Sequence, residues 1–381
     1  MLFSRRIDVL MRDPVLRGWL FGRLLGKWPS KKLMMTKPPY LNFNKITKEN
    51  SYTNTKIKER KYESPTTSFN QKFAGTWLTG DLQQRLVFDK LKDTESQFAF
   101  HRFSWISDPN PSFDPNWVAE LWKFWISDYG HVRDGLAWHP YTASERLVNI
   151  LRFFLKNGFP TSETETLQIL CEHGPHIFDN LEYYGIEDTG NHLVNNGRAL
   201  YLSGILLEIE PWVVAGCKII INESERLFNC TGEHREGSVH YHLLITSWYL
   251  ECWLAAKSAS RPEEKQLLEI VNSALSASFF FNLPGGLPLI GDVSPDCSPN
   301  HLLCLLNGRV EGWLLHRSSQ EQKDVLKLNN NAKKQRRKTS LADWWRLDLS
   351  PWSVIWPKIS DGWEPYPGHG HSDFGSFELH W

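Results

Sequence analysis

Residues 142–156, TASERLVNILRFFLK, carry the clearest fold signal in the chain. Thr142 and Glu145 have the spacing of a capping box, a pattern typical of a helix N-terminus. Gly158 and Pro160 follow as stop signals. Between them, apolar side chains recur at i, i+3, i+4 and i+7, which places them on one helical face. They are Leu147, Ile150, Leu151 and Phe154. The stretch is therefore predicted to be a helix that buries one face.

Similar helical patterns follow along the chain, separated by short connections that contain Gly or Pro. They cover about 162–184, 192–208, 211–228, 238–258 and 262–281. Short links between long helices indicate antiparallel hairpins. Such hairpins build a solenoid, a bundle or an α/α toroid, and periodicity does not choose among the three. Trp117, Trp122 and Trp125 share one helical face, so we interpret them as core residues rather than a sugar-stacking platform.

The length of 381 residues exceeds the usual size of one hydrophobic core. Residues 29–72, rich in Lys, Asn, Thr and Pro, are interpreted as an extended surface segment. The basic run 333–338 is read as a solvated loop in preference to a polyanion contact. Residues 352–356 and 374–381 are predicted strands, and a last strand without a partner suggests a truncated reading frame or fragment. The predicted parts are 1–75, an N-terminal helix and surface segment; 76–316, a helical domain; 317–340, a polar linker; and 341–381, the start of a β-domain.

Composition excludes several functional classes. Lys plus Arg equals Asp plus Glu at 43 each, which argues against a nucleic-acid-binding surface and against general attraction of a polyanion. The six cysteines form no CxxC pair, so zinc fingers and redox motifs are not expected and the thiols are read as mostly buried. Arginines interrupt every apolar stretch of residues 1–30, which shows neither an export signal nor a membrane span. We expect that segment to pack on the body as a helix, in preference to a membrane surface, and the protein to be cytoplasmic, with a periplasmic location as the alternative.

Three short blocks concentrate imidazole, amide and phenol groups. They are TGNHLVNN at 189–196, GEHREGSVHYH at 232–242 and PGHGHSD at 367–373. Each block has a structural explanation when taken alone. An Asn at a helix start is commonly a cap, a Tyr in register with apolar residues is commonly core, and two histidines between glycines are commonly a surface loop. Their joint occurrence in this order favours a functional site.

The combined pattern resembles the heparinase II/III family of polysaccharide lyases. The similarity covers about residue 95 to the end, and its most specific parts are the Tyr-His and His-Gly-His blocks. The matching residues are Trp138, His139, Pro140, Tyr141 and Arg146; Asn191 and His192; Gly232, Glu236, Ser238, Tyr241 and His242; Gly291 and Asp292; and His369, His371, Asp373, Ser376 and Phe377.

The resemblance implies a mainly α fold, an incomplete (α/α) toroid followed by an antiparallel β-sandwich, with the active site in the cleft between them. Family members act on heparan-type glycosaminoglycans or alginate, so the expected partner is an acidic polysaccharide. The resemblance further implies that Asn191 and His192 bind and neutralise the uronate carboxylate, that Tyr241 is the acid and also a candidate base, and that His369 is the partner base. Expected substrate contacts are Arg146, Glu236, His242 and Tyr141.

These residue types suit β-elimination. A proton beside a carboxylate ionises with difficulty, so the enzyme must stabilise the developing enolate with hydrogen-bond donors. The base needs a pKa near the working pH, which suits His, whereas Tyr needs a lowered pKa or serves as the acid. Cationic histidines beside Tyr241 are expected to lower its pKa by their charge.

The sequence departs from the family pattern in two places. Asn195 stands where some members carry a glutamate, which puts in doubt the orientation of the site by that carboxylate. His371 would be one ligand of a structural zinc, but the chain ends before the later ligands. We therefore expect no cofactor for this chain and zinc only in a full-length form.

Two competing hypotheses remain open at this stage. A glycoside hydrolase on an α/α toroid would use two carboxylates, for which Glu187 with Asp188 or Glu233 with Glu236 are the candidates. A non-catalytic remnant of a lyase fold would bind acidic polysaccharide without cleaving it. Only a lyase leaves an unsaturated uronate that absorbs ultraviolet light.

Overall fold

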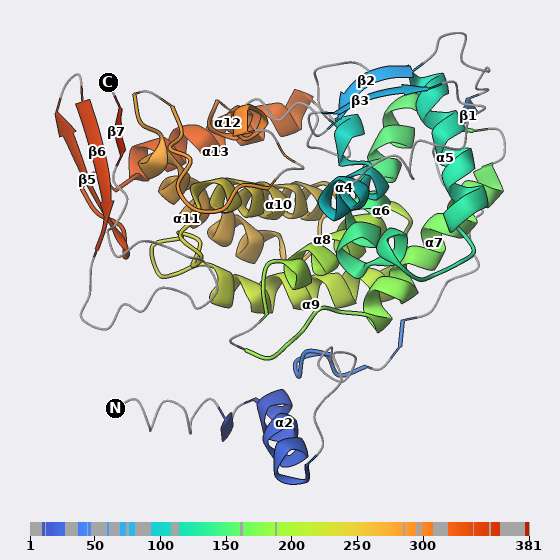
Figure 1. The fold of residues 1–381 in the computed structure, drawn as a ribbon. Coiled ribbons are helices and arrows are strands. Elements are labelled where there is room, and N and C mark those ends of the chain that lie inside the picture. The colour runs from blue at the N-terminus through green and yellow to red at the C-terminus, as the bar shows by residue number, and fades with distance from the viewer. Residues whose placement is uncertain are drawn as a thin grey trace. The chain divides into compact units, whose positions relative to one another are not determined.

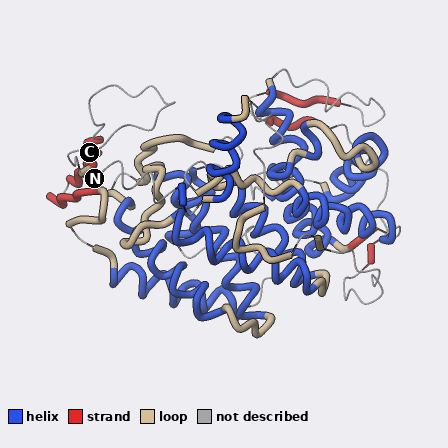
Figure 2. Tube along the Cα trace, turned by 90° about the horizontal axis from the view of Figure 1, so that it is seen from below, coloured by secondary structure: helices blue, strands red, loops and turns tan. Residues whose placement is uncertain are grey.

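The computed structural model of the chain forms two compact units, Met1–Glu223 and Ser224–Trp381, which are described separately (Figure 1). The boundary lies inside the range predicted as one helical domain. The structure describes residues 10–11, 13–26, 37–43, 45–46, 59–60, 69–73, 76–80, 93–107, 114–160, 163–186, 189–284, 286–294, 297, 299–307, 319–337, 339–349, 352–358 and 378–380. Helices make up most of this part of the chain (Figure 2).

The first unit is built mainly from helices. They are α2 Pro14–Leu24, α4 Thr94–Arg102, α5 Pro115–Tyr129, α6 Pro140–Asn157, α7 Glu163–Asp179, α8 His192–Leu206 and α9 Glu210–Leu227, whose last turn crosses the unit boundary. Two 3₁₀ turns, η2 Ser104–Ser107 and η3 Leu136–Trp138, join them. Strand β1 (Glu59–Arg60) pairs in parallel with β4 (Phe159–Pro160), and β2 (Phe69–Phe73) pairs antiparallel with β3 (Thr76–Gly80).

The helix predicted at 142–156 is confirmed as α6, but its start differs from the prediction. The helix begins at Pro140, a residue suited to the first turn because its missing N–H has no partner there. Thr142 lies inside the helix and is fully buried, so the predicted capping box is wrong. Gly158, with φ +89°, ends the helix as predicted.

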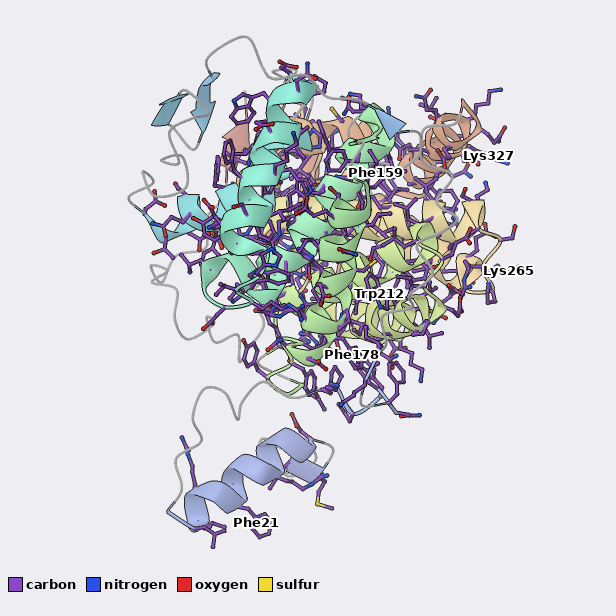
Figure 3. The ribbon with its side chains drawn as sticks, turned by 90° about the vertical axis from the view of Figure 1, so that its right-hand side faces the viewer. Phe21, Phe159, Phe178, Trp212, Lys265 and Lys327 are labelled. Carbon is purple, nitrogen blue, oxygen red and sulfur yellow. The ribbon has the colours of Figure 1, made fainter. Side chains whose placement is uncertain are left out.

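The core of the first unit is rich in aromatic side chains. Trp117, Trp122 and Trp125 of α5 are all buried, which confirms their interpretation as core residues. Phe159, Phe178 and Trp212 are also buried (Figure 3). Helices α8 and α9 approach closely at Gly216, where a Cβ would lie 2.5 Å from the backbone nitrogen of Tyr201. Glycine is required at position 216 because any side chain would collide with the backbone of α8.

Two observations concern the N-terminal region. In helix α2, the apolar side chains of Leu20, Phe21 and Leu24 are exposed. It is attached through Asp13, whose buried carboxylate accepts a hydrogen bond from the Ile186 N–H at 2.8 Å. Within the predicted surface segment 29–72, Leu41 is buried. Among the described residues, no helix is both long and apolar enough to span a membrane.

The second unit combines helices with an antiparallel sheet. Its elements are α10 Val239–Ser258, α11 Glu264–Phe281, α12 Pro299–Leu306, α13 Ser319–Gln335 and the sheet β5 (Trp344–Leu349), β6 (Trp352–Pro357) and β7 (Glu378–His380). The sheet contacts the helices through apolar side chains, including Phe280 and Phe281 of α11, Trp344 of β5 and Ile355 of β6. Arg346 of β5 adds a hydrogen bond to the carbonyl of Asn282 at 3.2 Å.

Helix α13 corrects the prediction of a polar linker at 317–340. Only Val325, Leu328 and Ala332 supply a buried apolar stripe along its middle, and the polar composition hides this pattern in the sequence. The basic run begins in its last turn with Lys333 and Lys334, where positive charge stabilises a helix C-terminus. The six cysteines are free thiols, but only Cys171 and Cys252 are buried, so the prediction of mostly buried thiols is wrong.

Candidate active site

The Asn-His block lies at the start of α8. Asn191 precedes the first helical residue, His192, but its side chain makes no capping hydrogen bond to the helix. The structure therefore does not support the interpretation of Asn191 as a helix cap. Asn191 is 8% exposed, so its amide sits at the edge of the core rather than in open solvent. The first N–H groups of α8 add the partial positive charge that makes helix N-termini favourable for anions.

His192 is oriented by a buried carboxylate that the sequence analysis did not single out. Its Nδ1 donates a hydrogen bond to Glu182 Oε1 at 2.8 Å. The side chain of Glu182 is 2% exposed, whereas that of His192 is 48% exposed. Because the proton on Nδ1 is committed to Glu182, Nε2 is the nitrogen left for a ligand. Glu182 Oε2 is buried and has no hydrogen-bond partner among the described residues.

A second histidine and a tyrosine complete this group. His139 Nε2 lies 3.7 Å from Glu182 Oε1. The Tyr141 ring centroid lies 4.5 Å from that of His192. Burial lowers the pKa of His139 from its usual value, against the opposing effect of Glu182, so His139 is neutral at neutral pH. We call Glu182, His139, Tyr141, Asn191 and His192 the Glu182 cluster. Three of these five, Tyr141, Asn191 and His192, were predicted site residues.

Arg146 takes a different role from the predicted substrate contact. It is fully buried, and its guanidinium lies 4.0 Å from the Trp125 ring centroid. Its Nε donates to His173 Nε2 at 3.0 Å, and Nη1 donates to the Ala137 carbonyl at 2.6 Å. Burial, followed by the charge of Arg146, lowers the pKa of His173, so this imidazole accepts as a neutral ring. Arg146 is therefore a buried structural residue with no exposed surface for contact with a polymer.

Asn195 is also a buried structural residue. Its Oδ1 accepts from Arg198 Nη1 at 3.0 Å, and Arg198 Nη1 lies 2.8 Å from Glu145 Oε1. The glutamate that some family members carry at this place is absent, but Glu182 brings a carboxylate to His192 from another segment.

Tyr241 belongs to the second unit, in the first turn of α10. Ser238 caps this helix, because its Oγ accepts the Tyr241 N–H at 3.0 Å and donates to the Asp292 carbonyl at 2.6 Å. Gly291 has φ +79°, and a Cβ there would lie 2.8 Å from the Ser238 Cα. The Gly-Asp block thus fixes the turn from which Tyr241 projects. Tyr241 itself is partly buried.

The two histidines beside Tyr241 are structural. His242 accepts the His234 N–H on Nδ1 at 3.2 Å, which leaves Nε2–H to donate to Ser278 Oγ at 2.9 Å. Burial lowers the pKa of His242 to about 4 and also lowers that of His240. Both rings are therefore neutral at neutral pH, which corrects the expectation of cationic neighbours for these two residues. His242 is 1% exposed, so the predicted substrate contact is corrected as well.

The acidic residues of the Tyr-His block divide into one exposed and one buried. Glu236 is exposed in the loop before α10, where contact with a ligand is possible. Glu233 is 1% exposed, and its Oε1 accepts from the Asp343 N–H at 2.6 Å. Burial raises the pKa of Glu233 to about 7. Its position under the Asp343 backbone gives it a structural role and weakens the hydrolase hypothesis for this pair.

Several predicted residues lie outside the described residues. They are His369, His371, Glu187 and Asp188. The role of His369 as base and that of His371 as a zinc ligand stay predictions. Within the described part of the chain, no group of three or more His, Cys, Asp or Glu residues is arranged to hold a metal ion.

Comparison with known proteins gives a consistent result. The family model described as Heparinase II/III N-terminus matches residues 68–296, more than half of the 381 residues. A heparin-sulfate lyase of Bacteroides thetaiotaomicron is 25% identical over 210 residues, which are 50% of this chain and 30% of that protein. The chain thus spans less than a third of that relative.

Solved structures agree on the fold. A heparinase III structure with methylated lysines has a TM-score of 0.52 and 19% identity, over 97% of this chain and 63% of that one. A mutant of the heparan sulfate lyase HepC from Pedobacter heparinus has a TM-score of 0.51 and 16% identity, over 82% of this chain and 52% of that one. These likenesses confirm the predicted fold class, mainly α with an incomplete toroid followed by antiparallel strands. The chain belongs to the heparinase II/III N-terminus family.

Proposed function

We propose that this protein is a polysaccharide lyase that cleaves a uronic-acid-containing acidic polysaccharide by β-elimination. The observation that carries the proposal is the Glu182 cluster. In it, a buried carboxylate orients the half-exposed His192 imidazole, and the adjacent Asn191 amide makes no capping hydrogen bond at the start of α8. The names of the relatives, a heparin-sulfate lyase and a heparan sulfate lyase, support the same reaction class.

The cluster has the chemistry needed to bind a uronate carboxylate. Asn191 offers an amide N–H, and the protonated form of His192 offers Nε2–H while Nδ1–H stays on Glu182. The negative charge of Glu182 balances the imidazolium from behind. Two donors on the carboxylate stabilise the enolate that forms when the adjacent C5 proton leaves, and the α8 N-terminus adds to their effect.

The remaining steps are proton transfers. A base takes the C5 proton, the electron pair forms the C4–C5 double bond, and the C4–O bond to the next sugar breaks. The leaving oxygen must receive a proton from an acid. We assign the acid to Tyr241, whose neighbours His240 and His242 are neutral, and the base to His369. The products are a new chain end and an unsaturated uronate.

The direct test uses the full chain with heparan sulfate, heparin and alginate as separate substrates. We expect ultraviolet absorbance to increase with at least one of them, and His192→Ala to lose most of that rate. Reducing ends that form without this absorbance would identify a hydrolase. Saturable binding of a polymer without any product would instead identify a binding protein and contradict the proposal.

Glu182→Gln tests the orienting role of the buried carboxylate. Glutamine keeps the shape of the side chain but removes the charge that balances the His192 imidazolium. We expect kcat/KM to fall about 10- to 100-fold, the range found when the hydrogen-bond partner of a metal-ligating histidine is removed. Initial rates measured by ultraviolet absorbance give the value, and the unfolding temperature shows that the fold is kept.

The matched control for this variant is Glu120→Gln. Glu120 lies on α5 and pairs with Lys123 at 3.1 Å on the surface. An exposed pair of this kind contributes little to stability, so we expect a rate within about twofold of the parent. Equal rates for Glu182→Gln and the parent would remove Glu182 from the site.

A further inference from the structure

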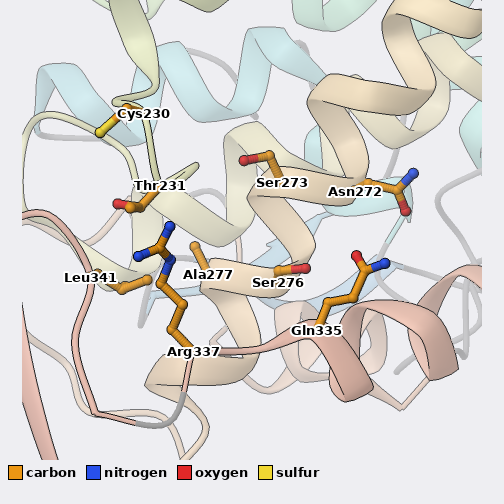
Figure 4. Close-up of a pocket in the computed structure, with 9 residues that line it drawn as sticks. All are labelled: Cys230, Thr231, Asn272, Ser273, Ser276, Ala277, Gln335, Arg337 and Leu341. Atoms are coloured by element: carbon orange, nitrogen blue, oxygen red, sulfur yellow. The ribbon is translucent and has the colours of Figure 1, made fainter.

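The second unit contains a polar pocket that the proposed reaction does not use. Its volume is about 300 Å³, and three segments line it. They are the loop that carries Cys230 and Thr231, helix α11, and the end of α13 together with Arg337 and Leu341 after it. Figure 4 shows the Arg337 guanidinium directed toward Thr231 and the Gln335 amide directed toward Ser276. The volume lies at the lower end of the range typical of small-molecule sites.

Most of the side chains that line this pocket can form hydrogen bonds, and the charged one is positive. Asn272, Ser273 and Ser276 come from one side of α11, and Gln335 faces them from α13. Among the described residues that line the pocket, Arg337 is the one cation and none carries a carboxylate. The Arg337 side chain is exposed and has no ion-pair partner among the residues that the structure describes. These donors and acceptors remain available to a ligand.

The charge around the pocket favours an anion. Lys333 and Lys334 lie in the last turn of α13, and Arg336 precedes Arg337. The chain as a whole has no net charge, so this is a local excess of positive charge rather than a property of the entire surface. An arginine guanidinium binds a carboxylate or sulfate through two parallel hydrogen bonds. Hydroxyl and amide groups beside it suit the hydroxyls of a sugar ring.

The loop that lines one side of the pocket leads directly into the block 232–242, which contains Tyr241. Thr231 Oγ1 accepts the Ala342 N–H at 2.9 Å and also lies 2.9 Å from Asn229 Oδ1. The next residue, Gly232, has φ +83°, and a Cβ there would collide with Ser273. The loop is therefore held against α11 by contacts that leave no room for a side chain. A ligand in the pocket would rest on the same rigid loop that leads to Tyr241.

We infer that this pocket is a secondary binding site for one acidic sugar unit, with Arg337 on its carboxylate or sulfate and the α11 and Gln335 side chains on its hydroxyls. This inference rests on the proposed function, since it takes its ligand class from the acidic polysaccharide. It adds a second binding site for the polysaccharide, in the second unit. Its lining residues do not include Tyr241, to which the acid role is assigned.

The test measures binding and turnover separately. Size-defined heparan sulfate and alginate oligosaccharides are the probes, with neutral maltooligosaccharides of the same length and inorganic sulfate as comparisons. Hydrogen–deuterium exchange of the full chain reports where each probe binds. We expect protection of peptides from residues 269–277 and 330–337 with an acidic oligosaccharide but not with the neutral one.

Two variants and one control locate the site. Arg337→Gln is expected to weaken binding about tenfold, the usual effect of losing one charge-assisted hydrogen bond. Ser276→Trp fills the pocket and should abolish the local protection. Lys265→Gln removes the same charge from the exposed start of α11, away from the lining residues, and should leave binding unchanged (Figure 3).

The outcomes separate this inference from the proposed function. Lyase activity with no protection of the pocket peptides, or with equal affinity in Arg337→Gln and the parent, would overturn the secondary site and leave the reaction intact. Protection by inorganic sulfate to the same extent as by the oligosaccharide would reduce the pocket to an anion site and also overturn the inference. Protection that depends on Arg337 in a chain without lyase activity would support the site and contradict the reaction.

Discussion

Tyr241→Phe is expected to lower kcat on the responsive uronate polymer by about 1,000-fold, within the range found when a general acid is removed. The phenol is the group proposed to protonate the leaving oxygen, and phenylalanine keeps the ring but has no proton to give. The backbone position of residue 241 does not depend on the phenol, since Ser238 caps α10 through the Tyr241 N–H at 3.0 Å. Binding of the polymer should therefore change little. Initial rates and a separate binding isotherm distinguish the two effects.

The matched control is Tyr249→Phe on the same helix. Tyr249 is 1% exposed, and its ring packs against Phe228 with centroids 5.4 Å apart, so it belongs to the core. We expect this variant to keep its rate within a few fold even if it loses some stability. A Tyr241→Phe protein with the parent rate would exclude the phenol from the chemistry. A loss of rate in both variants would indicate damage to α10 instead.

Arg146→Met is expected to destabilise the protein by about 4 kcal/mol, because it leaves buried hydrogen-bond acceptors without donors. The lost contacts are the hydrogen bonds to His173 Nε2 at 3.0 Å and to the carbonyls of His101 and Ala137 at 3.1 and 2.6 Å. The cation–π contact with Trp125 is lost as well. Methionine fills much of the volume, so the effect measures the polar contacts more than a cavity. Urea unfolding followed by circular dichroism gives the free energy.

Lys123→Gln serves as the control for Arg146→Met. Lys123 pairs with Glu120 at 3.1 Å, and its side chain is 51% exposed. Solvent screens such a pair, so its loss should cost less than about 1 kcal/mol. If Arg146→Met unfolds at the same urea concentration as the parent, the buried guanidinium is not a structural support. Its assignment as a substrate contact would then become the better explanation.

The sequence by itself determined the helices whose apolar faces follow a regular spacing. Helix α6 was recognised because Leu147, Ile150, Leu151 and Phe154 repeat within one segment, and such local patterns need no knowledge of the rest of the chain. Helix α13 was missed because only three of its residues, Val325, Leu328 and Ala332, form the buried stripe in a polar segment. The motifs that indicated the family are likewise local, and they pointed to Tyr141, Asn191, His192 and Tyr241.

Tertiary structure alone decided which of those residues are accessible. Arg146 and His242 belong to the same motifs as Tyr141 and Tyr241, yet both are buried in hydrogen-bond networks with residues from other helices. Glu182 shows the converse. It stands between Leu181 and Tyr183 with no sequence pattern around it, and it gains its role because folding places His192 2.8 Å away and His139, from another element, 3.7 Å away. Local spacing records which side chains share a helical face, whereas burial and pairing between elements depend on long-range contacts that no short segment contains.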